Sequence, residues 1–180
     1  MGKTFVVEIA TTGVKGCPED AVVQIGICRL NSDYSDFDSV YDATIELDPK
    51  NLGHDALDRI DSLYGISADS LYLGEDINDV CGEVRRILSG SECISFDKTT
   101  FSRFLCFEPW DLNRSVTFMP AVSLMIPRIF TECETPKLID EAYSHLLEGD
   151  PAGVGKNRSA LCMAQMTSCI VMEMRREGFY

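Results

Sequence analysis

The amino-acid sequence predicts a single α/β domain, in which helices flank a mixed central sheet. Three stretches at the start of the chain have the composition of strands, and short polar turns separate them. Apolar residues at helical spacing recur over 77–88 and again over about 158–176. Because 180 residues suit one domain with a substantial core, we expect residues 1–180 to fold as one unit.

The three early strands are predicted from their residue patterns. The first covers 5–9, runs into a Thr-Thr-Gly turn at 11–13 and contains one charged residue, Glu8. The second covers 21–30 and is rich in β-branched residues, whereas the third, 37–47, alternates apolar and polar residues as a partly exposed strand does. Because the connections are short, we expect these strands to form an antiparallel meander.

Helices and one further strand are predicted for the rest of the chain. A short helix is expected over 55–64, and the helix over 77–88 begins at the capping residue Asp76 and closes at Gly90. The apolar segment 93–96 suits a fourth strand, which should run parallel to the first because a helical crossover precedes it. Three more helices are expected over 99–107, 136–147 and 158–176, and 120–129 fits either a strand or a helix.

The chain is strongly acidic, and this charge bears on its partners. It has 29 acidic and 16 basic residues, for a net charge of -13. Such a surface repels phosphate backbones, so a protein partner or a homodimer is favoured, and single-stranded nucleic acid stays the alternative. No apolar run reaches the ~18 residues of a membrane span, and no signal peptide precedes the first strand. We therefore expect a cytoplasmic protein with no membrane partner.

The eight cysteines are scattered along the chain and form no Cys-x-x-Cys pair. No histidine stands at ligand spacing from any of them, so a zinc site has little support. We expect reduced thiols that serve as small apolar residues in the core.

Four blocks of the sequence, taken in order, resemble the DEDDh-type 3′–5′ exonucleases, a proofreading-exonuclease-like branch of the ribonuclease H-like superfamily. Glu-Ile-Ala-Thr-Thr-Gly at 8–13 is similar to the family's D-x-E-T-T-G, and 22–27 is similar to its second strand. Residues 104–112 look like the F-L-x-x-x-P-W-x-L block of some archaeal-looking members of the family. Residues 135–143 are similar to the family's P-K-L-x-E-A-Y motif, with which a helix begins. The resemblance covers nearly the whole chain and implies a ribonuclease H-like fold.

The resemblance also implies a chemistry. The family hydrolyses phosphodiester bonds with two divalent ions, Mg²⁺ or Mn²⁺, which four carboxylates hold, and a histidine acts as general base for the attacking water. The five corresponding positions in this chain are Glu8, Ala10, Thr100, Asn157 and Cys162. A carboxylate survives at Glu8, one methylene longer than aspartate, and the other four positions are substituted. The catalytic motifs are therefore degenerate.

The third carboxylate position depends on a one-residue gap. It falls on Thr100 or on Phe101, while Asp97, about one helical turn earlier, is a candidate substitute. In a role without metal, Asp97 would cap the following helix, Glu8 would cap the Thr-Thr-Gly turn, and Cys162 would fill the vacated metal cavity.

Two hypotheses follow from these substitutions. The first is a pseudoenzyme linked to nucleic-acid metabolism, which needs no cofactor and keeps the fold for binding; if any residue holds a metal, it is Glu8. The alternative is an active 3′–5′ exonuclease whose Mg²⁺ or Mn²⁺ ligands have moved to Glu8, Asp97 and further residues. A retained nucleic-acid cleft would lie around Thr11, Thr12 and Arg158.

Overall fold

The computed structural model describes residues 3–126, 135–147 and 158–180. Its five strands form one mixed sheet in the order β3-β2-β1-β4-β5. The first three strands pair antiparallel, whereas β4 runs parallel to β1 and β5 parallel to β4. The strands are β1 (Thr4–Thr11), β2 (Val22–Leu30), β3 (Phe37–Thr44), β4 (Glu92–Ile94) and β5 (Thr117–Phe118). The mixed sheet that the sequence predicts is thereby confirmed.

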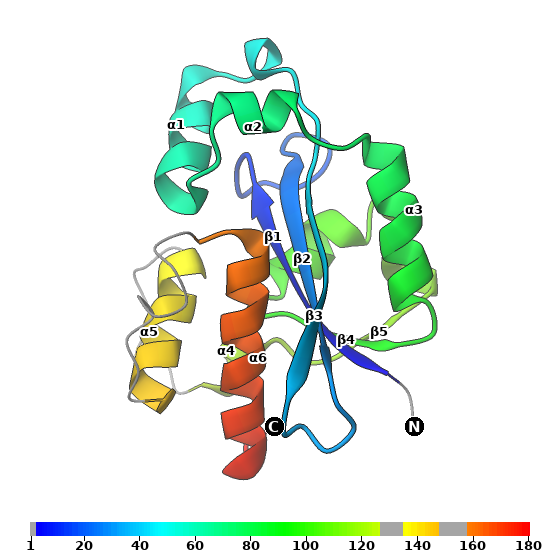
Figure 1. Ribbon diagram of the computed structural model, residues 1–180, viewed down its shortest axis with the longest axis vertical. Coiled ribbons are helices and arrows are strands. Elements are labelled where there is room, and N and C mark those ends of the chain that lie inside the picture. Colours follow the sequence, from blue (N-terminus) through cyan, green and yellow to red (C-terminus); the bar gives the residue numbers. More distant parts are fainter. Residues whose placement is uncertain (1–2, 127–134, 148–157) are drawn as a thin grey trace.

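Helices cover both faces of this sheet (Figure 1). On one face, α5 and α6 pack with α1 and α2 around a first apolar cluster; on the other, α3 and a π-helical segment, η2, surround a second. The helices are α1 (His54–Tyr64), α2 (Ala68–Tyr72), α3 (Ile77–Leu88), α4 (Val122–Met125), α5 (Thr135–Leu147), α6 (Ala160–Arg176) and η2 (Thr100–Leu105). Among the helices so described, none is long and apolar enough to cross a membrane.

The central strand β1 is buried along its whole length because the sheet is covered on both sides. Its side chains alternate between the two apolar clusters: Val7 faces the cluster at α3, and Val6 and Ala10 face the cluster at α6. Since Glu8 lies between Val6 and Ala10 in this alternation, its side chain points to the α6 side of the sheet. The strand therefore carries its one carboxylate into the interior.

The start of α6 rests directly on β2. Gln24 accepts a hydrogen bond from the backbone N–H of Ala160 at 2.8 Å, which satisfies one donor of the first helical turn. At Gly26, an added Cβ would lie 2.2 Å from the backbone nitrogen of Leu161. The missing side chain of Gly26 thus allows the helix backbone to touch the sheet, and this contact fixes where α6 begins.

Most predicted elements are present, with three differences. The helix expected over 99–107 is shorter and π-helical, Thr100–Leu105. The strand β5 and the helix α2 were not expected, because two and five residues are too few to show a period. In the ambiguous segment 120–129, Val122–Met125 is helical, and 127–129 lie outside the described residues.

Candidate functional site

A cavity of about 370 Å³ opens at the carboxyl ends of β1 and β4. Because these parallel strands end at the same edge of the sheet, the cavity collects side chains that are far apart in the sequence. Glu8 and Asp97 both line it, together with Thr100 of η2 and Met163 of α6. The structure therefore brings Glu8, Asp97 and Thr100 together around one cavity.

Glu8 lies at the floor of this cavity and is 2% exposed. Its Oε1 accepts hydrogen bonds from the backbone N–H of Phe96 at 2.6 Å and from the Thr167 hydroxyl at 3.0 Å. Its Oε2 accepts a third bond, from the Ser95 hydroxyl at 3.2 Å. Burial raises the pKa of Glu8 to about 8, against the opposing effect of these hydrogen bonds, and the charge of Asp97 adds to the increase. Burial therefore favours the protonated form of Glu8 in the folded protein.

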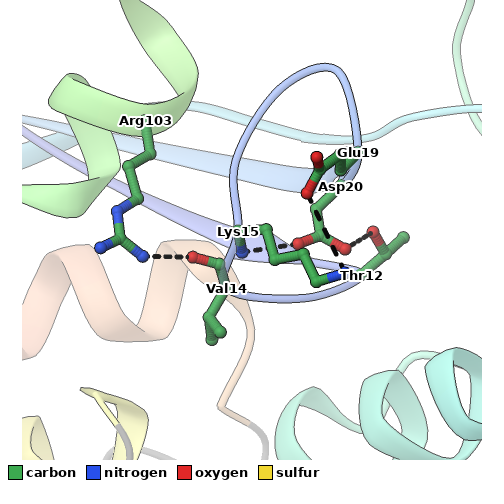
Figure 2. A network of polar contacts seen from close by, with 6 residues as sticks. All are labelled: Thr12, Val14, Lys15, Glu19, Asp20 and Arg103. Carbon is green, nitrogen blue, oxygen red and sulfur yellow. Dashed lines mark hydrogen bonds and ion pairs between the residues drawn. The ribbon is translucent and has the colours of Figure 1, made fainter.

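The prediction that Glu8 caps the Thr-Thr-Gly turn was wrong, because Asp20 closes that turn instead. Its carboxylate accepts hydrogen bonds from the Thr12 hydroxyl at 3.4 Å and from the backbone N–H of Lys15 at 2.6 Å (Figure 2). The Thr11 hydroxyl donates to the carbonyl of Gly13 at 2.7 Å. The hydroxyls of Thr11 and Thr12, candidates for nucleic-acid binding, are thus both engaged within the turn.

Asp97 directly follows β4, and its Oδ1 accepts a hydrogen bond from the backbone N–H of Thr99 at 2.8 Å. This is a local turn within the segment before η2. The N-cap of η2 is Thr99 and no side chain caps that helix, so the expectation that Asp97 caps it is not met. Thr100 is 5% exposed at the cavity wall, whereas Phe101 packs in the second apolar cluster and stacks on Phe118 at 4.5 Å between ring centroids. Of the two alternatives for the third carboxylate position, the structure places Thr100 at the cavity.

On α6, the residues that meet the cavity are not the expected ones. Ser159 caps the helix by accepting a hydrogen bond from the Cys162 N–H at 3.2 Å. Cys162 packs in the first apolar cluster, where burial raises the pKa of its thiol, and Met163 lines the cavity. Met163 and Thr167 are four residues apart and share one helix face, which directs both towards β1. Asn157 lies outside the described residues.

Arg158 and Ala10 occupy positions that serve the fold. The guanidinium of Arg158 donates through Nε to Asp140 of α5 at 2.6 Å, and this ion pair joins the start of α6 to α5. The side chain of Arg158 is 34% exposed, so the pair is partly shielded from solvent. Ala10 is fully buried on the face of β1 that carries Glu8. Neither position offers an oxygen ligand to the cavity.

Two arginines that the sequence analysis did not single out also line the cavity, Arg59 of α1 and Arg103 of η2. Arg103 donates a 2.6 Å hydrogen bond to the carbonyl of Val14, in the loop that follows the turn (Figure 2). Arg59 lies against Tyr64, whose pKa is raised by burial and lowered by hydrogen bonds to Thr11 and by the charge of Arg59. Isolated arginines carry no local sequence signal, which is why only the fold reveals them.

The donor set of the cavity does not fit a two-ion site. Such chemistry uses several carboxylates from different elements, with oxygen ligands in near-octahedral geometry. Among the described residues, Glu8 and Asp97 are the carboxylates that line the cavity, and three internal donors occupy Glu8. Within 3–126, 135–147 and 158–180, no three His, Cys, Asp or Glu side chains gather as a metal site.

Comparison with solved structures shows which fold surrounds this cavity. A 3′-exonuclease studied for recognition of the histone mRNA stem-loop is 14% identical, with a TM-score of 0.69 over 98% of this chain and 83% of that one. The nuclease domain of 3′hExo, a DEDDh family member bound to rAMP, is 16% identical, with a TM-score of 0.66 over 98% of this chain and 93% of that one. Exonuclease I of E. coli, bound to a dA16 oligonucleotide, is 10% identical, with a TM-score of 0.64 over 98% of this chain and 41% of that one.

These likenesses confirm the ribonuclease H-like exonuclease fold that the four sequence blocks imply. No protein-family profile matches the sequence. No curated protein matches it either. At such low identity the shared architecture establishes the fold, and the activity has to be argued from the residues of the cavity.

Proposed function

We propose that this chain is an exonuclease-fold protein that has lost two-metal 3′–5′ hydrolysis and acts by binding, in a role linked to nucleic-acid metabolism. The observation that carries this proposal is the state of Glu8. Its side chain is buried, accepts three hydrogen bonds from within the protein, and is 2% exposed. A carboxyl group so engaged stabilises the junction of β1, β4 and α6, and these bonds occupy three of its lone-pair sites.

The neighbouring substitutions support the same proposal. Ala10 and Met163 have no oxygen in their side chains, and Thr100 has a hydroxyl in place of a carboxylate. Because catalytic groups act as a unit, the loss of one member can remove nearly all of the rate. An active enzyme with relocated ligands, the alternative, would require Glu8 to ionise and to share with an ion the oxygens that now accept internal hydrogen bonds.

The partner is proposed from charge and from the retained cavity. A net charge of -13 favours a protein partner over a phosphate backbone, and a second copy of the chain is the other protein partner proposed. The cavity with its two arginines supports single-stranded nucleic acid as a second candidate. Electrophoretic shift of labelled single-stranded DNA and RNA near physiological salt, run beside a measurement of molar mass in solution, separates the two. Strong nucleic-acid binding by a monomer would overturn the preference for a protein partner.

We predict that saturating Mg²⁺ or Mn²⁺ leaves the melting temperature of the protein essentially unchanged. An ion bound to the folded state at 100 times its Kd would add about 2.7 kcal/mol to the free energy of unfolding, an easily measured shift. The measurement is thermal unfolding with each ion and with EDTA. Since an acidic surface binds cations diffusely, Glu8→Gln is the control: a metal-induced rise that this variant abolishes would contradict the proposal.

A further inference from the structure

We propose that the cavity binds a phosphate group without any metal ion, between the guanidinium groups of Arg103 and Arg59. This inference rests on the proposed function, because it assigns a ligand class to a cavity that no longer holds catalytic ions. It replaces the metal ions of two-metal hydrolysis with two protein cations. The site so assigned consists of Arg59, Thr99, Thr100 and Arg103 around the mouth of the cavity.

Arg103 is placed for this task by its own contacts. Its Nη1 donates to the carbonyl of Val14 at 2.6 Å, and its backbone carbonyl accepts a hydrogen bond from the N–H of Cys17 at 3.0 Å. Arg103 therefore joins the loop after β1 to η2 through its backbone and through its side chain, whose bond to Val14 is drawn in Figure 2. A guanidinium has five N–H donors in a planar fork, so the bond to Val14 leaves further donors for a ligand.

Arg59 comes to the cavity from a different element, α1. Burial raises the pKa of Tyr64, and the charge and the hydrogen bond of Arg59 lower it. Tyr64 is a buried residue that is 4% exposed and that also bonds to Thr11. Arg59 of α1 and Arg103 of η2 thus both line one hollow of about 370 Å³. Planar, weakly hydrated guanidinium groups match phosphate oxygens in bidentate geometry, which is why arginine prevails at phosphate sites.

The other residues that line the cavity indicate which class of ligand it can bind. Thr99 and Thr100 add hydroxyl donors, and a volume of about 370 Å³ suits a small ligand. Asp97 is the opposing feature, because its carboxylate repels an anion in the same cavity. Glu8 is turned away from the mouth, towards Phe96, Ser95 and Thr167. The balance of groups at the mouth therefore favours an anion within a chain whose net charge is -13.

The test is calorimetric titration in EDTA with five probes: inorganic phosphate, uridine monophosphate, uridine, and a short oligothymidylate with and without a 3′-phosphate. We expect the phosphate-bearing probes to bind and uridine to give no signal. Binding of inorganic phosphate and of uridine monophosphate supports a free ion or nucleotide as the source. Selective binding of the 3′-phosphorylated oligonucleotide supports a nucleic-acid end. Absence of binding by every phosphate-bearing probe overturns the inference.

Three variants and a control assign the site. We expect Arg103→Gln to weaken binding by about tenfold, since a charge-assisted hydrogen bond is lost, and Arg103→Lys to restore part of it. Arg86→Gln is the matched control, because Arg86 is an exposed arginine of α3 that pairs with Glu83 outside the cavity. Asp97→Asn should strengthen phosphate binding by removing a like charge, whereas at a metal-mediated site it would weaken it.

The outcomes also separate this inference from the proposed function. Equal losses in Arg103→Gln and Arg86→Gln, or weaker binding in Asp97→Asn, overturn the phosphate site. If one of these outcomes is found and Mn²⁺ produces no cleavage of the oligonucleotides, the phosphate site is overturned but the proposed loss of nuclease activity is not. Phosphate binding that requires Mn²⁺ and disappears in EDTA contradicts both proposals, because the ion would then be part of the site. Circular dichroism of each variant verifies folding, and Arg103 is exposed, so its replacement leaves the core intact.

Discussion

Replacement of Glu8 by glutamine is expected to stabilise the protein, and to do so more strongly as the pH rises. In the unfolded chain the carboxyl ionises at its ordinary pKa of 4.5, whereas burial raises its pKa to about 8 in the folded state. Between these values the folded state binds one more proton than the unfolded state. The free energy of unfolding therefore falls as the pH rises, by about 1.4 kcal/mol per pH unit from this group. Glutamine keeps the shape and removes this dependence.

The measurement is urea unfolding of the wild type and of Glu8→Gln across this pH window. We expect the advantage of the variant to grow by about 4 kcal/mol between roughly pH 5 and pH 8, and to level off above. Glu108→Gln is the control, because Glu108 is exposed and its loss changes the net charge equally. A difference that stays constant with pH would show that Glu8 is ionised in the folded state, and the proposed function would then lose its main support.

A second large effect is expected at Gly26, where Gly26→Ala should strongly destabilise the fold. The added Cβ would lie 2.2 Å from the nitrogen of Leu161 and 2.4 Å from the carbonyl carbon of Ala160. Both contacts are backbone atoms, so the start of α6 would have to move as a unit. Overpacking typically costs about 1–3 kcal/mol, and we expect a loss of about 3 kcal/mol or more here because no side chain can rotate away.

Gly82→Ala is the matched control for this prediction. Gly82 lies inside α3, and nothing stands within 4 Å of its added Cβ, so the same substitution should stabilise that helix by about 1 kcal/mol. Urea unfolding measures both variants. A cost of less than about 1 kcal/mol at Gly26 would mean that α6 does not contact β2 as described. The cavity wall formed by Met163 would then lose its support.

The fold was largely predictable from the sequence because long elements show their period. The alternation of β3 and the apolar stripe of α3 give strong local signals. The parallel pairing of β4 followed from the crossover that precedes it, although the strand has three residues. The two residues of β5 join the sheet through tertiary pairing with β4, and no local pattern announces them.

The site was predictable only in part, and α6 shows why. Motif alignment placed the last ligand position at Cys162, one residue before Met163, which lines the cavity. A helix turns by 100° per residue, so an error of one position moves a side chain to a different face. Where the motif residues are substituted, nothing in the sequence fixes that register. The partners of Glu8, Ser95 and Thr167, are common polar residues whose role appears only when β1, β4 and α6 meet.

The loss of hydrolysis is tested most directly by incubating the wild type and Glu8→Gln with end-labelled single-stranded DNA and RNA in the presence of Mn²⁺. We predict that the wild type shortens neither substrate more than Glu8→Gln does, because Glu8 is engaged inside the protein and the cavity lacks the carboxylates that two ions require. Stepwise Mn²⁺-dependent shortening from the 3′ end by the wild type, absent in Glu8→Gln, would contradict this prediction and show an active exonuclease.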